Sequence, residues 1–464
     1  MTTNWRYALF TLAIVPILIL TAQSITATPF LITAVIASIV VAVVTFHRPE
    51  SGLIIVVFSM LLSPQIIVAN IPGRELTLRV DDLLIIVMLL SWLAYTANDK
   101  DWKGFVKTPL DFNLLLLTVL YIATTGLGIL SGNLNPLKSA FYMLKYLEYF
   151  VLFWVTANIV STSKSLPKFL VSGAVTAIIV AIYAYSLMGK VERVYAPFEL
   201  GGGEPASLAG YYLVVYGILS GFFLSSDNKR VRYFCVALAV FILPTFIKTF
   251  SRASYLAFVP MSLTMLLLTK KRKGSFALIL ILGAILFPIF FGGLYQDMVN
   301  RVNSTFIGTS SMSRGESLAN RQIRDPSATD RIDSWKWVIK ERLTTDVKSL
   351  LIGRGITGVG FIDGQVFTFL GEIGILGTIV FYWLMFKILL ISHHTYKTIE
   401  DDTVKGLSLG LIGALVGLLF QSATTNTFII VRINEPLWFL TALVMIAPEL
   451  YAVERSRISE LKPA

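Results

Sequence analysis

Charged residues, cysteine and histidine are scarce in this sequence, and each shortage excludes a class of protein. Charged residues make up 14% of the 464 residues, against 55% hydrophobic ones. Because soluble domains carry about 25% charged residues, a water-soluble globular protein is excluded. The single cysteine, Cys235, cannot form an internal disulfide or a cysteine metal cluster. Long apolar runs fill almost the whole chain instead, and they predict an all-α, polytopic membrane protein.

Apolar stretches bounded by charged residues, Gly, Pro or Asn predict about fourteen transmembrane helices. Arg6 and the short apolar core after it resemble a signal peptide, but a second span follows so closely that we favour an uncleaved helix. Prolines inside the third, ninth and tenth spans are expected to kink helices without ending them. The predicted spans are residues 7–22, 29–46, 51–69, 80–96, 110–130, 137–160, 166–187, 206–224, 232–250, 253–268, 275–293, 364–386, 406–425 and 435–452.

The net charge of +11 is distributed in a way that indicates orientation. The segments between consecutive predicted spans lie on opposite sides of the membrane in turn. Most Lys and Arg residues of the short segments lie on the side that includes the N-terminal segment. Such an excess marks the cytoplasmic side of a membrane protein. We therefore predict that both termini are cytoplasmic, and that the basic charge does not indicate a nucleic-acid partner.

One connection is much longer than the others, and it sets the predicted domain organisation. Transmembrane helices 1–11 occupy residues 1–293, and a large extracytoplasmic loop follows at 294–362. Transmembrane helices 12–14 occupy 364–452, and 453–464 form a cytoplasmic tail. A loop of this length in a compact protein is usually functional or disordered.

The long loop combines a flexible part with a predicted helix. Residues 303–329 are rich in Ser, Thr, Gly and Asn, which favours a flexible segment. Residues 330–343 predict an amphipathic helix capped by Asp330. Two interpretations stay open: a helix on the outer membrane surface, or a lid over a site. The apolar face of this helix is predicted to hold Ile332, Trp335, Ile339 and Leu343.

The predicted cytoplasmic segments lack nucleotide-binding motifs, so we expect any catalytic site on the outer face. The predicted cytoplasmic segments contain no P-loop, no dinucleotide-binding glycine pattern and no Asp-x-Asp sugar-nucleotide motif. His47, His393 and His394 all fall in predicted cytoplasmic segments. No histidine is therefore available outside as a base or metal ligand, and we expect neither a metal nor a cofactor there.

Cations in the predicted outer segments need an explanation, because orientation disfavours them. Each one alone fits a side chain that extends to the lipid headgroups. Taken together, they favour a shared anionic ligand such as a lipid diphosphate, since arginine binds phosphate oxygens in bidentate fashion. These cations are Arg74, Arg79, Arg193, Lys248, Arg252, Arg331, Arg354 and Arg432.

Three further charges lie within predicted spans, where charges are usually paired or functional. Lys145 and Glu148 are three residues apart on one helix face, and we favour a pair between them over a functional role. Glu372 lies about 12 Å into the twelfth span at the helical rise, and we expect it to line a cavity.

Four stretches together resemble the O-antigen polymerase and O-antigen ligase superfamily of bacterial inner membranes. The resemblance covers roughly residues 75–450, and its specific part is the order of the motifs. A Ser-Arg pair at a span precedes the single long outer loop, and a Gly-rich motif follows that loop. The four stretches are Leu144–Tyr149, Phe250–Ser254, Asp330–Trp337 with Ile352–Gly355, and Asp363–Gly377.

The resemblance implies a metal-independent glycosyltransferase whose donor is a glycan on undecaprenyl diphosphate at the outer leaflet. The acceptor would be a hydroxyl of another lipid-linked glycan, with membrane lipids and a chain-length regulator protein as candidate partners. It implies that Arg252 and Arg331 stabilise the leaving diphosphate and that Asp363 is the general base. Lys248, Arg193 and Arg354 would support the diphosphate.

The final motif departs from the ligase branch of this superfamily. That branch carries a histidine followed by an amide or hydroxyl residue, where this chain has Asp363 and Gly364, whereas Gly374 and Gly377 keep the family spacing. The departure favours a polymerase over a ligase. An O-antigen ligase, an oligosaccharyltransferase and a lipid-linked-oligosaccharide flippase remain alternatives, although a flippase needs no long external loop. Asp363 has the alternative role of a helix cap, and Gly371, Gly374 and Gly377 are expected to allow close helix packing.

Overall fold

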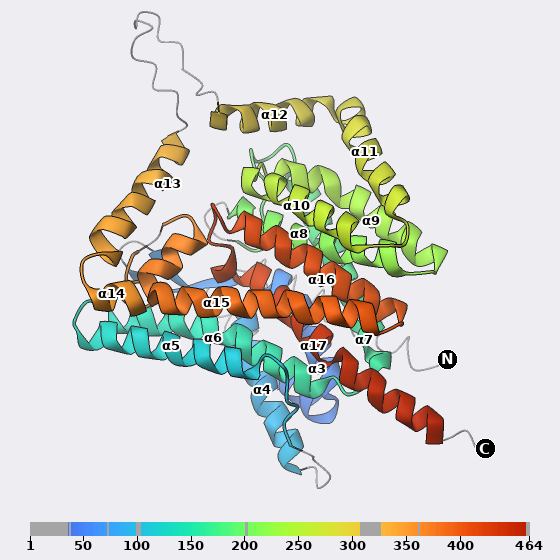
Figure 1. Cartoon of the computed structure of the whole chain (residues 1–464), viewed down its shortest axis with the longest axis horizontal. Coiled ribbons are helices and arrows are strands. Elements are labelled where there is room, and N and C mark those ends of the chain that lie inside the picture. The colour runs from blue at the N-terminus through green and yellow to red at the C-terminus, as the bar shows by residue number, and fades with distance from the viewer. Residues whose placement is uncertain are drawn as a thin grey trace, which may run out of the picture.

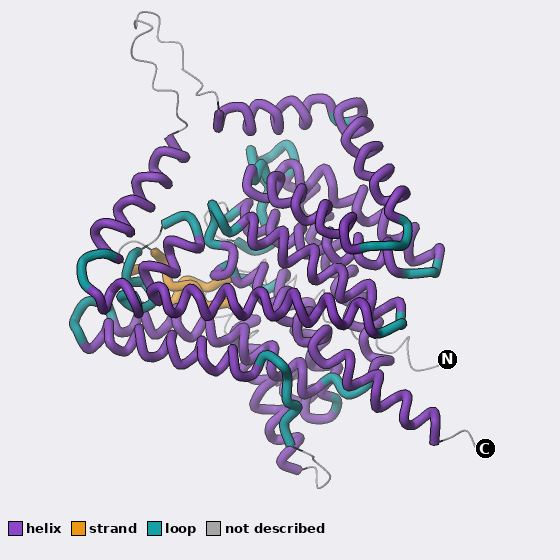
Figure 2. Tube along the Cα trace, viewed as in Figure 1, coloured by secondary structure: helices purple, strands orange, loops and turns teal. Residues whose placement is uncertain are grey.

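The computed structural model describes residues 39–71, 74–98, 104–199, 203–306, 326–360 and 362–460, together with Ile36. Most of them form helices packed side by side in one bundle (Figure 1), and Figure 2 shows a short hairpin of two strands within it. Helical residues at 39–47 come first. The helices that follow are α3 (Pro49–Leu62), α4 (Val80–Asn98), α5 (Asp111–Leu130), α6 (Pro136–Ile159), α7 (Leu166–Leu187), α8 (Pro205–Ser225), α9 (Lys229–Lys248), α10 (Arg252–Leu268), α11 (Lys273–Phe290), α12 (Gly292–Phe306), α13 (Pro326–Trp337), α14 (Val347–Ile352), α15 (Gln365–Thr398), α16 (Asp402–Gln421) and α17 (Val431–Glu460), with short 3-10 turns η1 (Ser163–Ser165) and η4 (Thr427–Ile429).

The described helices are those of a membrane protein. Eight of them are long and apolar enough to cross a bilayer, and α3 and α10 are shorter apolar helices. The all-helical class is therefore confirmed at this level, while the count of fourteen spans stays a prediction. The first predicted span, 7–22, and the start of the second lie outside the described residues.

The prediction of the third span, 51–69, is wrong at its end. Helix α3 stops at Leu62, and the chain continues as strand β1 (Gln65–Ile71), which pairs antiparallel with β2 (Arg74–Arg79). Pro64 lacks an N–H and disfavours a helical conformation of Ser63, which is extended here (φ −84°, ψ 129°). A proline expected to kink a helix instead ends it.

Two helices near the C-terminus are longer than predicted. Helix α15 continues to Thr398 instead of ending at 386, so His393 and His394 belong to a helix and not to a connection. Lys387 lies inside the same helix and donates a hydrogen bond to the Asn113 side chain (2.8 Å). Helix α17 begins at Val431 and runs to Glu460, through most of the predicted tail at 453–464.

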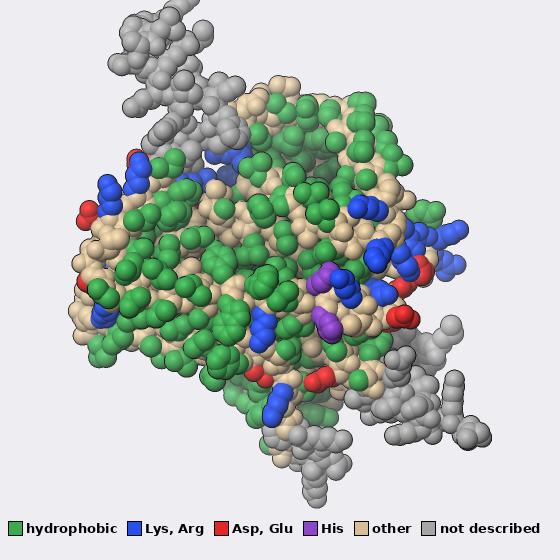
Figure 3. All heavy atoms as spheres, viewed as in Figure 1, with side chains coloured by type: hydrophobic (Ala, Val, Ile, Leu, Met, Phe, Trp, Pro, Cys, Tyr) green, Lys and Arg blue, Asp and Glu red, His purple; other side chains and the backbone are tan. Residues whose placement is uncertain are grey.

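The connections gather at two ends of the bundle. At one, called the loop end below, the N–H of Val194 donates to the carbonyl of Lys248 (3.2 Å). At the opposite end, Asp227 pairs with Lys271 (3.0 Å). Figure 3 shows hydrophobic side chains across the broad middle, with Lys and Arg mainly near these two ends. The two sets match the predicted alternation, and the set that faces the cytoplasm stays a prediction. The loop end holds connections at 188–205, 249–252, 353–364 and 422–434, and the opposite end those at 226–228, 269–272 and 399–401.

Helices α8 and α16 form the centre of the bundle, and glycines let them approach each other. Gly217 and Gly221 of α8 face Gly406 and Gly410 of α16. A Cβ atom at Gly221 would overlap the carbonyl oxygen of Gly406 and the backbone of Gly410. Small residues four apart permit such backbone contact between membrane helices.

We expect Gly221→Ala to destabilise the bundle, because its methyl group would push α8 away from α16. Overpacking of this kind costs about 1–3 kcal/mol. The midpoint of thermal aggregation in detergent measures the effect. Gly126→Ala in α5 is the matched control, since nothing lies within 4 Å of its new Cβ. Equal midpoints for the two variants would contradict the packing argument.

The predicted outer segment at 294–362 is largely helical where it is described. Helix α12 extends to Phe306, and α13 begins at Pro326, so Asp330 lies inside a helix and the predicted cap is wrong. After Trp337 the helix continues as a π-helix, η3 (Val338–Leu343). Val338 and Leu343, at the two ends of this π turn, are both buried, whereas the predicted Ile339 is 40% exposed. Most of the predicted flexible segment lies outside the described residues.

Candidate active site

A network of buried charges occupies the loop-end half of the bundle. Arg79, at the end of β2, is 3% exposed, and its Nε donates to Asp81 Oδ1 (3.1 Å) in the first turn of α4. Its Nη2 donates to the carbonyl of Met60 (2.7 Å), and its backbone N–H donates to Asp82 Oδ2 (2.8 Å). Arg79 therefore joins β2, α3 and α4, and it is not a side chain reaching the headgroups.

Helix α6 adds the pair that the sequence singled out. Lys145 Nζ lies 3.7 Å from Glu148, as the spacing suggested, but its closer contact is with Asp82. Glu148 Oε1 and Asp82 Oδ1 are buried with no hydrogen-bond partner in the described part of the chain. Lys145 thus links α6 to α4 instead of pairing only within α6.

Helix α17, near the C-terminal end of the chain, completes this charge network. Arg432 is 1% exposed; its Nη1 donates to the carbonyl of Leu61 (2.9 Å), and its Nε lies 3.3 Å from Glu199. Glu435 is fully buried, and neither of its carboxylate oxygens has a hydrogen-bond partner among the described residues. Glu199 and Glu435 are therefore both enclosed, although they lie in or next to connections at the loop end.

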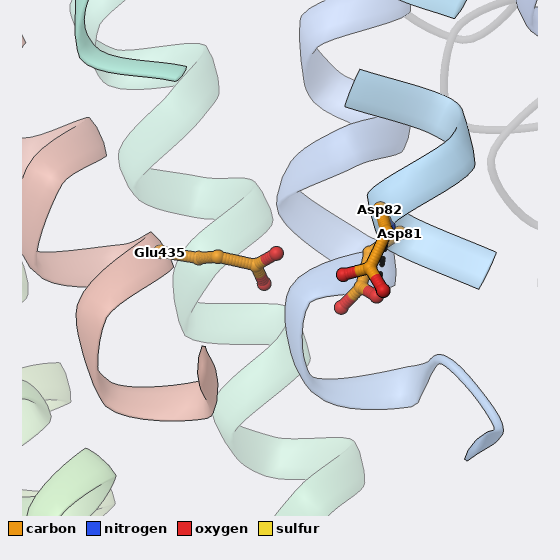
Figure 4. A group of neighbouring side chains, drawn as sticks. All are labelled: Asp81, Asp82 and Glu435. Atoms are coloured by element: carbon orange, nitrogen blue, oxygen red, sulfur yellow. Dashed lines mark hydrogen bonds between the residues drawn. The ribbon is translucent and has the colours of Figure 1, made fainter. Parts of the chain in front are cut away.

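Glu435 points toward the two aspartates of α4 (Figure 4). One carboxylate oxygen from each of Asp81, Asp82 and Glu435 lies within 4.8 Å of the others, a spacing that would admit a cation. However, Arg79 and Lys145 already neutralise the aspartates. The trio is therefore part of an ion-pair network in which five carboxylates surround three cations.

Two adjoining cavities lie beside the charge network. The larger has a volume of about 370 Å³, and the smaller, about 70 Å³, lies toward α15. Tyr142, Lys145 and Ile429 line both, so the two cavities share a wall. Glu372, predicted to line a cavity, lies in the wall of the smaller one. Arg79, Glu199 and Arg432 line the larger one.

The smaller cavity borders a break in helix α15. Gly374 has φ +68° and ψ −171°, which interrupts the helix one residue after Ile373. The N–H of Arg354 donates to the carbonyl of Gly371 (3.0 Å), and the N–H of Gly355 to that of Glu372 (2.8 Å). The Gly-rich residues therefore accommodate the outer segment, which packs against the broken helix.

Asp363 and Arg331, to which the sequence assigned separate roles, form an ion pair. Arg331 Nε donates to Asp363 Oδ2 (2.8 Å), with both side chains about one-third exposed. The indole N–H of Trp335 donates to the backbone carbonyl of Asp363, and the Trp335 ring stacks on Phe367 (4.7 Å). Gly364 is the N-cap of α15 and has no side chain to accept a bond. Asp363 is thus fixed between α13 and the start of α15.

The predicted diphosphate ligands Arg193, Lys248 and Arg252 converge at the loop end. Arg193 Nε donates to the carbonyl of Thr249 (3.0 Å), in the turn between Lys248 and Arg252. Burial lowers the pKa of the Arg193 guanidinium, and repulsion from Arg301 of α12 adds to this, with a smaller contribution from Arg252. We call Arg193, Lys248, Arg252 and Arg301 the cation cluster. Because Arg301 and Arg252 repel the Arg193 guanidinium, and Glu192 offsets only part of this repulsion, an anion bound among the cations would be stabilised.

Arg354, the remaining predicted ligand, holds the outer segment together. Its Nε donates to the carbonyl of Arg342 (3.1 Å), and its Nη2 donates to the Thr345 hydroxyl (2.8 Å). These contacts tie the end of η3 to the loop after α14. They give Arg354 a structural role in this conformation.

The end of α16 connects the Ser-Arg motif with the Asp363 motif. Gln421 Nε2 donates to the hydroxyl of Ser254 (2.9 Å), two residues after Arg252. The carbonyl of Ser422 accepts from the backbone N–H two residues after Asp363 (3.0 Å). The Ser-Arg motif and the Asp363 motif, more than a hundred residues apart in the sequence, therefore both contact the C-terminal end of α16.

Four residues of these groups were not expected from the sequence, namely Asp81, Asp82, Glu435 and Arg301, whereas Arg432 was expected only as an outer cation. Asp81 and Asp82 were placed within the fourth span without comment, although three charges in four residues at a span boundary are unusual. Arg432 and Glu435 repeat the i, i+3 spacing of Lys145 and Glu148, which was a usable signal. Arg301 belongs to a helix that the sequence analysis treated as loop, and no signal singled it out.

The structure alone places the protein among helical membrane proteins, with a buried charge network and a cation cluster at one end of its bundle. The sequence was compared with protein-family models and with curated proteins of known function. No family model and no curated protein matches it.

Proposed function

We propose that the protein is a membrane glycosyltransferase that joins undecaprenyl-diphosphate-linked oligosaccharide repeat units into O-antigen or exopolysaccharide at the outer face of the bacterial inner membrane. The cation cluster carries this proposal. Arg193 comes from the connection before α8, whereas Lys248 and Arg252 flank the turn between α9 and α10, and Arg301 of α12 joins them at the loop end. Arginine forks suit a diphosphate, whose developing charge they stabilise as it leaves.

The reaction needs few groups from the protein. The acceptor hydroxyl passes its proton to the Asp363 carboxylate, and its oxygen forms a bond to the anomeric carbon of the donor sugar. The bond between that carbon and the diphosphate breaks, and the leaving diphosphate keeps the electron pair. In this proposal Arg331 positions Asp363, since its Nε already donates to the carboxylate, and the cation cluster holds the diphosphate.

Glycan profiling of a deletion strain tests the proposed function. If the protein is a polymerase, the strain retains glycans of one repeat unit and loses longer ones, and the intact gene restores them. Polymer that forms but is no longer attached to its acceptor would indicate a ligase instead. Loss of all exported glycan would indicate a flippase.

We expect Arg252→Ala to abolish polymer while the protein remains in the membrane at normal abundance. Arg252→Lys should restore only part of the polymer, because an ammonium group cannot reproduce the bidentate fork of arginine. Polymer length on gels and immunoblots of membrane fractions give the two measurements. Arg230→Ala is the matched control, since this arginine lies exposed at the opposite end of α9. Normal polymer in the Arg252→Ala strain would remove this residue from the site.

A further inference from the structure

One face of α6 forms a continuous wall along both cavities. Lys138, Tyr142, Lys145 and Tyr149 follow one another at intervals of four, three and four residues, so they lie on one side of the helix. Tyr146 lies beside them and lines the smaller cavity. This wall therefore combines aromatic rings with polar tips, and we call the two cavities that it borders the trough.

The cations of the larger cavity are already paired, and the carboxylates of the network outnumber them. These cations, Arg79, Lys145 and Arg432, each pair with a carboxylate of the network. A diphosphate placed there would be repelled by those carboxylates, whereas in the cation cluster Arg301 and Arg252 repel the Arg193 guanidinium, and an anion would relieve that repulsion. The trough therefore suits an uncharged, polar ligand.

Two polar groups in the wall of the larger cavity indicate what such a ligand presents. Ser207 Oγ and Arg432 Nη2 are buried and have no hydrogen-bond partner among the described residues. Gln65 and Thr77 of the hairpin face the same cavity. Buried polar groups are normally satisfied, so these lack partners that a hydroxyl-rich molecule would supply.

We propose that the trough binds the sugar portion of a lipid-linked glycan, apart from its diphosphate. A pyranose ring has an apolar C–H face that packs on tyrosine rings and a rim of hydroxyls that donate and accept hydrogen bonds. The larger cavity falls within the range of roughly 300–1,000 Å³ typical of small-molecule sites. This inference rests on the proposed function for the identity of the glycan, and the trough is its saccharide subsite.

Binding of free oligosaccharide to the purified, full-length protein in detergent tests the proposal. The probe is the repeat unit of the host's own glycan, released from its lipid carrier by mild acid, and titration calorimetry measures its Kd. Tyr142→Ala should raise this Kd about tenfold, the effect expected from losing one aromatic contact. Tyr142→Phe should stay near wild type because it keeps the ring. Tyr233→Ala is the matched control, since Tyr233 is 73% exposed on the outside of α9.

A second variant tests the proposal independently in case Tyr142→Ala does not fold. Thr77→Trp on the hairpin would fill part of the larger cavity and should block binding. Absence of binding to the wild-type protein, or wild-type affinity in folded Tyr142→Ala and Thr77→Trp variants, would overturn the proposal.

The same probe shows which glycan occupies the trough. When it is added to protein turning over labelled lipid-linked repeat units, its incorporation into product identifies an acceptor subsite. Inhibition without incorporation identifies a donor subsite, and both results support saccharide binding. Calorimetry needs no turnover, so the two proposals can fail separately. If deletion of the gene leaves polymer unchanged but the protein still binds the oligosaccharide through Tyr142, the polymerase proposal is refuted and saccharide binding in the trough is retained.

Discussion

Replacing Asp363 with Asn is expected to lower the turnover of lipid-linked repeat units by about 10²–10⁴-fold, the usual contribution of a general base. The asparagine oxygen can still accept from Arg331 Nε, 2.8 Å from the carboxylate in the native protein. The Trp335 bond to the backbone at this position is also retained. The loss should therefore come from basicity, with the local structure intact. Single-turnover rates in proteoliposomes give the measurement.

Two further variants sharpen this test. Asp333→Asn is the matched control, because Asp333 lies exposed on α13 beside Lys336. Asp363→His introduces the ligase-type residue and should retain more activity than Asp363→Asn. If Asp363→Asn polymerises at the wild-type rate, the base is another carboxylate. The base is then to be sought among Glu199, Glu204 and Glu372, which all line the two cavities.

Replacing Arg79 with Met is expected to destabilise the protein by about 3–5 kcal/mol, the cost of breaking a buried ion pair on one side. The substitution leaves Asp81 without its cation in an enclosed site and the carbonyl of Met60 without its donor. Chemical unfolding in detergent, followed by tryptophan fluorescence, measures the change.

A double variant separates lost charge pairing from lost packing. Arg79→Met combined with Asp81→Leu removes both partners and should recover part of the stability, because no isolated charge remains. Lys168→Met is the control: Lys168 pairs with Glu50 at 3.7 Å, is half exposed and should matter little. Wild-type stability of Arg79→Met would mean that the charge network does not hold α3, α4 and β2 together.

Features that depend on neighbouring residues were predictable from the sequence. The apolar runs predicted most of the described helices within a few residues, because a span must be long and apolar to cross a bilayer. The i, i+3 spacing predicted that Lys145 and Glu148 would be close, and they are 3.7 Å apart. The turn at Thr249 placed Lys248 and Arg252 together for the same reason.

Features that depend on distant contacts were not predictable. The residues of the charge network come from β2, α4, α6, α17 and the connection before α8, and no local pattern shows that such segments meet. The strand after Pro64 forms because a second segment pairs with it. The burial of Val338 in place of Ile339 likewise occurs at a π-helix, which no local sequence pattern indicated.

The break at Gly374 makes the outer segment a constitutive part of the hydrogen bonding within the bundle. Helix α15 has, in effect, an internal C-terminus, whose carbonyls at Gly371 and Glu372 have lost their helical donors. Arg354 and Gly355 supply the replacement N–H groups from outside the helix. Excising this part of the segment, or exchanging it for that of another protein, would expose two peptide carbonyls where water is scarce, at several kcal/mol each. The segment and α15 are therefore constrained to evolve as one unit.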